Sequence, residues 1–350
     1  QGLHGKDAQG RNIYKYGGDY NNYDPSDNNF NCNGLISPDR VPNPHMYETG
    51  YYYQNIWAMP VDLKASKIKV SNEYFFRDLS NYKLVWTILV DGRKLQSGEI
   101  ENLDIAPRQT KEYTLNYRFD ETLPGEVLLN ITFVLKKAEP LMQAEQVVAY
   151  CQMPIKDYSF GFTQTPQTVN AGKLKLVNKK NTDNIAISNN RCNIIFDKAT
   201  GQLIRYTVCN LSFLGEGGTL KPNFWRAVTD NDMGSGLNSK YKVWRNPHIE
   251  LLKIDTEKQG ADVKVTTVYN MPETAATLTL AYTIAPDGSM QVEQQLVADK
   301  SADTPNMLRY GIVMELPYQL EHSEYYGRGP IENYVDRKHS QLIGIYTQTA

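Results

Sequence analysis

The stretch NFWRAVTDND, residues 223–232, is the part of the sequence around which the other motifs are arranged. Two aromatic residues, Phe224 and Trp225, directly precede Arg226, and Asp232 ends the stretch. Polar groups packed this closely beside large rings predict a fixed loop rather than a core strand, because Asp and Asn side chains bond to nearby backbone amides and hold a turn. The loop is either a rigid turn inside a β-domain or a polar rim presented to a sugar or a neighbouring domain.

Length and composition indicate a β-rich protein of two or three domains. The chain has 350 residues, of which 41% are hydrophobic and 22% charged, as in ordinary globular proteins. Its 24 tyrosines favour strands and surfaces where rings meet sugars or partners. A formal net charge of −2 indicates no attraction to nucleic acid or to anionic membranes, and no apolar run is long enough to span a bilayer.

The four cysteines are far apart in the sequence. They show neither metal-ligand spacing nor a CxxC pair, so we expect four free thiols, most of them buried. These thiols are Cys32, Cys151, Cys192 and Cys209.

The N-terminal residues read as one β/α unit. After loop-like opening residues, the segment 13–20 predicts a short strand, with a close backbone approach at Gly17-Gly18. A long polar loop over residues 21–33 follows, and the spacing of apolar residues over 45–57 predicts a helix. If the unit belongs to a (β/α)₈ barrel, this loop lies on the catalytic face and the other units precede Gln1.

From Val61 to about Pro154 the hydrophobic period changes to two. Alternating apolar residues and regularly spaced turn signals predict an antiparallel β-sandwich of about 95 residues, the size of an immunoglobulin-like domain. Residues 164–181 read as a polar linker or edge segment. The β-pattern then resumes, with paired strands predicted over 192–208 and a hairpin over 278–296.

Four motifs in order carry a resemblance to a known family. YGGDY at 16–20, FNCNGLISPDR at 30–40, NFWRAVTDND at 223–232 and YYGRGPIENYVDR at 325–337 together resemble the C-terminal part of β-galactosidases of glycoside hydrolase family 2. The resemblance implies a mainly β chain that is cut at both ends. Residues 1–57 would end a (β/α)₈ catalytic barrel, 58–154 would form an immunoglobulin-like β-sandwich, and 155–350 would begin a large terminal β-sandwich.

The resemblance also implies what this chain lacks. The family hydrolyses terminal β-D-galactosides with retention, using two carboxylates about 5 Å apart. Both carboxylates, and the Mg²⁺ ligands, lie in the family on the part of the barrel that would precede this sequence. No catalytic residue is therefore assigned here, and the chain alone is expected to be inactive.

A sodium site is the main feature that carries over. Phe30, through its backbone oxygen, and Asn33, through its side-chain amide, match the family's Na⁺ ligands, and Asn33 also resembles a residue near the galactose 6-hydroxyl. Carbonyl and amide oxygens suit a hard cation. Without the resemblance, Asn33 reads as an Asx cap before Gly34 and Phe30 as a core anchor. The family often has Arg where this chain has Asn28, and the match at Ser26 supports no further ligand.

The remaining motifs indicate interdomain structure. Arg226 is followed by Asp230 and Asp232, a spacing that allows a rigid Arg–carboxylate pair, and a flexible tail over 234–236 is expected after it. We expect this loop to brace the terminal sandwich against the barrel. The histidines, His339 among them, share no metal spacing and read as surface or structural residues.

Two other functions remain open. One is a non-catalytic β-sandwich module for carbohydrate binding or subunit assembly. The other is a related exo-glycosidase such as a β-glucuronidase, which the RAVTDND motif disfavours. For the complete enzyme the resemblance implies a galactoside substrate, the rest of the barrel as a partner and assembly into a homo-oligomer. The sequence assigns no localisation.

Overall fold

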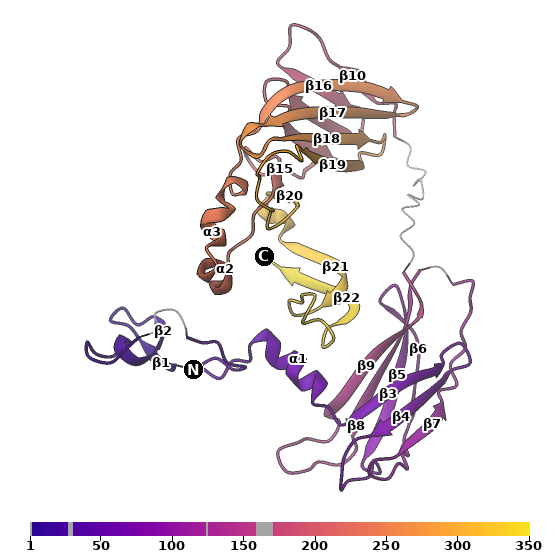
Figure 1. The fold of residues 1–350 in the computed structure, drawn as a ribbon. Helices are drawn as coiled ribbons and strands as arrows, with labels where there is room; N and C mark the ends of the chain where they lie inside the picture. Colours follow the sequence, from indigo (N-terminus) through magenta and orange to yellow (C-terminus); the bar gives the residue numbers. More distant parts are fainter. Residues whose placement is uncertain (1, 27–30, 124, 159–170) are drawn as a thin grey trace. The chain divides into compact units, whose positions relative to one another are not determined.

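Strands dominate the structure, a computed structural model that describes residues 2–26, 31–123, 125–158 and 171–350 (Figure 1). The mainly β fold predicted from the sequence is confirmed. Contacts divide the chain into a first unit, residues 1–161 with 322–349, and a second unit, residues 162–321 with Ala350. The domain ranges 1–57, 58–154 and 155–350 stay predictions.

The N-terminal part of the first unit is a hairpin followed by a loop and a helix. Its elements are β1 (Leu3–Lys6), β2 (Asn12–Lys15), the 3₁₀ turn η1 (Gly17–Asp19) and α1 (Pro44–Tyr52). The predicted order of strand, loop and helix is confirmed by β2 and α1. The predicted close approach at the glycines is also confirmed, since a Cβ on Gly17 would lie 2.1 Å from the Pro25 carbonyl oxygen.

Three predicted boundaries in this segment are wrong. The opening residues form β1, which pairs antiparallel with β2, and the strand predicted over 13–20 ends at Lys15. The helix predicted over 45–57 ends at Tyr52. Ile56 and Ala58 point into the sandwich core with Trp57 between them half-buried, so an alternating burial pattern replaces the helical one.

The rest of the first unit is the predicted β-sandwich. A three-stranded sheet in the order β3-β4-β7 faces a four-stranded sheet in the order β6-β5-β8-β9. The strands are β3 (Ile56–Asp62), β4 (Lys67–Asn72), β5 (Tyr82–Val90), β6 (Arg93–Ile100), β7 (Thr110–Thr114), β8 (Val127–Leu135) and β9 (Val147–Lys156). Alternate residues such as Leu84, Trp86 and Ile88 are buried between the sheets, which supplies the main apolar stabilisation of the unit.

The hairpin of β21 (His322–Gly329) and β22 (Leu342–Thr349) packs with this first unit although it follows the second unit in sequence. Gln152 of β9 and Ile343 of β22 exchange two hydrogen bonds of 2.8 Å, one in each direction. The Tyr150 hydroxyl donates to the Ser340 carbonyl at 2.9 Å. The last strands of the chain are therefore anchored on the edge of the immunoglobulin-like sandwich.

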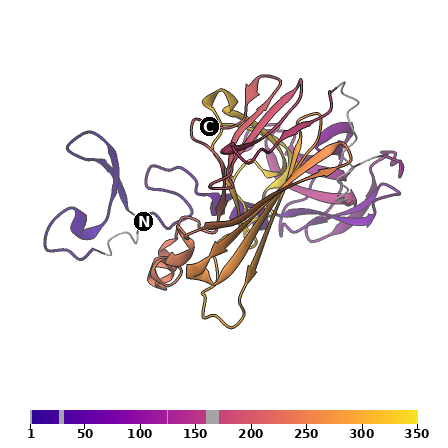
Figure 2. The same ribbon diagram turned by 90° about the horizontal axis from the view of Figure 1, so that it is seen from above.

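The second unit is a sandwich of a five-stranded and a four-stranded sheet (Figures 1 and 2). The first sheet contains β10 (Lys175–Val177), β11 (Asn184–Ser188), β12 (Cys192–Asp197), β13 (Leu203–Val208) and β14 (Leu211–Ser212). The second sheet contains β16 (Glu250–Gln259), β17 (Asp262–Met271), β18 (Ala276–Ile284) and β19 (Met290–Ala298). Phe196 and Tyr282 meet edge to face between the sheets, with ring centres 5.0 Å apart.

Shorter elements lie beside these sheets. They are β15 (Leu220–Asn223), which pairs with β20 (Gly311–Met314), the helices α2 (Asp230–Gly234) and α3 (Leu237–Lys240), and the 3₁₀ turns η2 (Lys242–Trp244), η3 (Pro272–Thr274) and η4 (Tyr318–Leu320). Both strand pairs predicted from the sequence, β12–β13 and β18–β19, are confirmed. The predicted linker over 164–181 contains β10, and its residues up to 170 lie outside the described part of the chain.

Candidate functional site

The predicted sodium and substrate residues lie in the loop between β2 and α1. Asn33 is exposed, and its side chain makes no hydrogen bond with any residue that the structure describes. The predicted alternative, an Asx cap closed by this side chain, is therefore not formed within the described residues. Phe30 and Asn28 lie outside the described residues.

The residues on both sides of Asn33 are held in place. Asn31 donates its side-chain amide to the Tyr14 carbonyl at 3.2 Å and accepts from the Cys32 backbone amide at 2.8 Å. On the other side, the Gly34 carbonyl accepts from Asn43 at 2.7 Å and meets Nε2 of His45 at 2.8 Å. Asn33 therefore carries a side-chain amide that no described residue binds, between neighbours that hydrogen bonds hold in place.

A second contact ties this loop to the hairpin. The Tyr14 hydroxyl donates to Asp39 at 2.7 Å, and this bond holds the pKa of the Asp39 carboxyl below its usual value. The hairpin, the Asn33 loop and the start of α1 are thus joined by side-chain hydrogen bonds rather than by an apolar core. Such a segment has its geometry set by polar contacts, which water can compete for when the segment is exposed.

The chemistry of Asn33 fits a monovalent hard cation. Its amide oxygen is a neutral acceptor without another partner in the described chain, and neutral oxygens satisfy such a cation without adding charge. Across the described residues, no cluster of three or more His, Cys, Asp or Glu side chains could hold a metal ion. The four cysteines are free, as predicted, but the expectation that most of them are buried is wrong, since Cys151 and Cys192 are buried while Cys32 is half-buried and Cys209 is exposed.

The stretch at 223–232 forms the predicted fixed polar loop. Phe224 is 1% exposed and lies against Trp244, with ring centres 5.4 Å apart. Arg226 and Asp232 form a bidentate pair, with nitrogen-to-oxygen distances of 2.5 and 3.2 Å. The Arg226 guanidinium, joined by the Thr229 backbone amide, lowers the pKa of Asp232 to about 2. The predicted Arg–carboxylate pair is confirmed for Asp232.

Asp232 also takes part in capping α2, a helix that the sequence did not predict. Thr229 accepts from the Asp232 amide at 3.2 Å, and Asp232 accepts from the Thr229 amide at 2.8 Å, which is a capping box at the start of α2. The tail over 234–236, predicted to be flexible, instead joins α2 to α3, with Gly236 at a φ of 71°. Thr followed three residues later by Asp is the signal that could have revealed this helix start.

Lowering the pH should release this loop through Asp232. The folded-state pKa of about 2 lies below the unfolded value, so the stabilisation is complete above about pH 4 and is lost as the pH falls towards 2. Thermal unfolding of Asp232→Asn should therefore fall below that of the parent at about pH 5, and the difference should close near pH 2. Asp303→Asn, at an exposed position of the same unit, should show neither effect. A difference that stays constant over this range would contradict the assignment.

A further cluster, centred on Glu48 of α1, was not predicted. Glu48 is 8% exposed, and its carboxylate accepts from the backbone amides of His339 and Ser340 at 3.0 and 2.9 Å. Nδ1 of His339 lies 3.3 Å from the same carboxylate and 2.8 Å from the Tyr52 hydroxyl. Burial acts to raise the pKa of Glu48, but the amides of Ser340 and His339 outweigh it and hold the pKa below its usual value. His339 is thus a structural histidine, as predicted, with a partner that the sequence did not reveal.

Comparison with protein families assigns each part of the chain. Residues 1–58 match "Glycosyl hydrolases family 2, TIM barrel domain", residues 68–156 match "Beta-galactosidase, domain 4", and residues 188–350 match "Beta galactosidase small chain". Of the helices in the described residues, none is long and apolar enough to cross a membrane.

Three relatives are similar along almost the whole chain. A β-galactosidase of Priestia megaterium is 30% identical over 99% of this chain and 33% of its own length. β-Galactosidases of Halalkalibacterium halodurans and Clostridium acetobutylicum are 29% and 28% identical, over 96% and 100% of this chain and 32% and 38% of their own lengths. The chain thus spans about a third of the length of these relatives.

The consecutive matches place this chain among the glycoside hydrolases of family 2. Within that family, two of the three matching models and all three of these relatives carry the name β-galactosidase.

Proposed function

We propose that this chain is part of a retaining β-galactosidase that hydrolyses terminal, non-reducing β-D-galactose residues, with the catalytic carboxylates outside this sequence. The observation that carries the proposal is the order of the family matches, from the TIM barrel domain through domain 4 to the small chain. In this proposal a galactoside is the substrate and the remainder of the barrel is the partner. Assembly of the complete enzyme into a homo-oligomer stays a prediction.

The purified 350-residue chain should not hydrolyse a chromogenic β-galactoside, because hydrolysis with retention needs two carboxylates about 5 Å apart. Co-expression with a chain that supplies the remaining barrel strands should give turnover. The control is the same barrel chain with its nucleophile replaced, which should give none. Turnover by the 350-residue chain alone would contradict the proposal, since the carboxylates would then lie within it.

We further propose that Asn33 contributes a side-chain oxygen to a sodium ion beside the substrate and that Phe30 contributes its backbone oxygen. The support is the exposed, uncommitted Asn33 amide between pinned neighbours. Bound there, the ion would supply a fixed positive charge that orients a substrate hydroxyl. Mg²⁺ would bind to residues outside this chain. The Asn33 amide itself can position the substrate by donating or accepting a hydrogen bond.

Replacing Asn33 by Ala in the active, co-expressed enzyme should raise the Na⁺ concentration for half-maximal activity about tenfold, because one ligand worth about 1.4 kcal/mol is lost. Asn33→Asp keeps the oxygen and should retain the Na⁺ response. ²³Na NMR line broadening gives a readout independent of turnover. If Asn33→Ala left both the Na⁺ titration and the line width unchanged, Asn33 would not be a ligand.

The Arg226–Asp232 loop is proposed to brace the terminal sandwich against the barrel. Its support is the bidentate pair, which fixes the loop without help from the barrel. Arg226→Ala should reduce the stability or the activity of the co-expressed enzyme, and unchanged values of both would refute the brace.

A further inference from the structure

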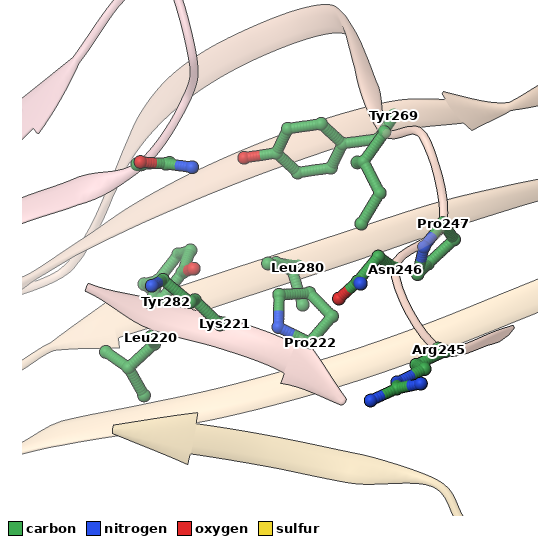
Figure 3. A pocket seen from close by; sticks show the side chains of 11 residues that line it. Leu220, Lys221, Pro222, Arg245, Asn246, Pro247, Tyr269, Leu280 and Tyr282 are labelled. Carbon is green, nitrogen blue, oxygen red and sulfur yellow. The ribbon is translucent and has the colours of Figure 1, made fainter. Parts of the chain in front are cut away.

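A pocket of about 290 Å³ in the second unit has no role in the proposed function (Figure 3). It is lined by residues of β17 and β18 on one side and by β15 and residues 245–249 on the other. Its volume is at the lower end of the range for small-molecule sites, so it can hold one ring-sized ligand.

The floor of the pocket is an apolar surface between two phenols. Thr267 and Leu280 are cross-strand partners, and Tyr269 and Tyr282 lie two residues to either side of that pair on the same inward face. Figure 3 shows the Tyr269 ring lying over the sheet, with its hydroxyl directed towards the side on which Tyr282 lies. Leu280 lies between them and is 2% exposed.

One polar group that lines the pocket is the hydroxyl of Tyr282. The residue is 1% exposed, yet its hydroxyl makes no hydrogen bond with any residue in the described ranges. Because Tyr282 lines the pocket, a molecule bound there can accept a hydrogen bond from this hydroxyl or donate one to it. Burial, together with the neighbouring Tyr269 phenol, raises the pKa of Tyr282 above its usual value, so the group stays a neutral donor. Its ring is held by Phe196, which leaves the hydroxyl in a fixed position.

The opposite wall is also apolar, whereas the rim supplies hydrogen-bond donors. Leu220 and Pro222 of β15 cover the floor. The rim carries Lys221, Arg245 and Asn246, all exposed, and no Asp or Glu is among the described residues that line the pocket. Ammonium and guanidinium groups only donate, so the pocket offers many more donors than acceptors.

We propose that this pocket binds one acidic monosaccharide, a hexose ring that carries a carboxylate or a phosphate. The apolar floor and the apolar wall opposite it match the two C–H faces of a pyranose ring. Phenol and amide groups match its hydroxyls, and the cationic rim matches its acid. A neutral sugar would leave the cations unused, and a bare anion would leave the apolar walls uncovered.

Isothermal titration of the purified 350-residue chain tests the proposal with four probes. Galacturonate and glucose 6-phosphate represent the carboxylate and phosphate forms of the ligand. Galactose is the neutral ring and inorganic phosphate is the anion without a ring. At least one acidic sugar should bind with a Kd of about 1 mM or tighter, and at least about tenfold more tightly than galactose or phosphate.

Two variants, each with a matched control, locate the binding. Tyr282→Phe should weaken binding of the acidic sugar about tenfold without lowering the unfolding temperature, because the lost hydroxyl has no partner in the described chain. Tyr206→Phe, which removes a phenol bonded to Gly288 elsewhere in the unit, should leave binding unchanged. Arg245→Gln should weaken the acidic sugar selectively, whereas Arg205→Gln, an exposed arginine on β13, should not.

Each contrary result overturns the proposal. If neither acidic sugar bound, the proposal would be wrong. It would also be wrong if galactose or inorganic phosphate bound as tightly as the acidic sugars. Unchanged affinity in Tyr282→Phe would place the binding elsewhere. The inference is independent of the galactosidase proposal, because none of these measurements involves turnover.

Discussion

Replacing Glu48 by alanine is expected to destabilise the contact between α1 and the connection preceding β22 by about 3 kcal/mol. The substitution removes the acceptor of two backbone amides, those of His339 and Ser340, at a residue that is 8% exposed. Each amide left unpaired and shielded from water costs about 1–3 kcal/mol, so their sum dominates the small loss of apolar contact.

The loss of the Glu48 carboxylate would affect more than α1. The same connection is also held by Tyr150, which donates to the Ser340 carbonyl, and by the paired bonds between Gln152 and Ile343. Glu48 is therefore the point at which α1 joins a network that already links β9 to β22. In a complete enzyme, this network would connect the end of the barrel to the last strands of this chain.

Hydrogen exchange of a peptide that covers residues 339–340 measures the effect directly. A loss of about 3 kcal/mol corresponds to exchange that is roughly a hundredfold faster at these two amides. Glu48→Gln keeps one carbonyl acceptor and should lose about half as much. Glu112→Ala, an exposed glutamate on β7, should change nothing. If the protection of the two amides survived Glu48→Ala, another group would have to hold them.

The parts of the fold that could be predicted are those whose signal is local. Leu84, Trp86 and Ile88 alternate in the sequence and are 0%, 6% and 2% exposed, since a half-buried strand has a period of two. The hairpin predicted over 278–296 is likewise confirmed, and Asp-Gly pairs lie at the turns of both the β18–β19 and the β5–β6 hairpins. Here sequence pattern, local geometry and burial all agree.

Prediction failed where tertiary contacts override local pattern. The helical spacing of apolar residues continues through Ile56. In the structure, Ile56 is buried in the sandwich and is the first residue of β3. β1 was missed because its residues are mostly exposed and its sheet contains only one other strand, β2. The pairing of Glu48 with His339 joins residues 291 positions apart, and a single sequence holds no signal for it.

For the site, the predicted Arg226–Asp232 pair is confirmed, whereas the roles of Phe30 and Asn33 stay predictions. Arg226 and Asp232 are six residues apart, so their pairing could be inferred from chemistry and spacing. That the Asn33 amide has no partner among the described residues could not be inferred, because it depends on Asn31 and Gly34 being held by other residues. The sequence also could not predict that the Tyr282 hydroxyl has no partner among the described residues, since this results from the way in which two sheets pack.

Replacing Asn72 by aspartate should destabilise the first sandwich by about 4 kcal/mol at neutral pH, although only an NH₂ group becomes an oxygen. Asn72 is 1% exposed, and its side-chain amide donates to the carbonyls of Arg77, Ile105 and Ala106 at 2.8–3.1 Å. Its own oxygen accepts from the Tyr74 amide at 3.0 Å. An aspartate would set a buried negative charge against three carbonyl oxygens, which is among the costliest arrangements in a protein interior.

Urea unfolding at several pH values separates the lost donor from the added charge. The carbonyls should raise the pKa of the new carboxyl in the folded state, so its protonated form, with one donor restored, is favoured. The deficit of Asn72→Asp should therefore be smallest below about pH 4 and should grow as the pH rises towards the folded-state pKa.

Asn72→Ala, which adds no charge, should lose about 2–3 kcal/mol independently of pH. Asn102→Asp, an exposed asparagine in the same sandwich, should stay within about 0.5 kcal/mol of the parent. Equal deficits for Asn72→Asp and Asn102→Asp would mean that the three carbonyls are satisfied by water, and that the Asn72 side chain does not tie β4 to residues 105–106.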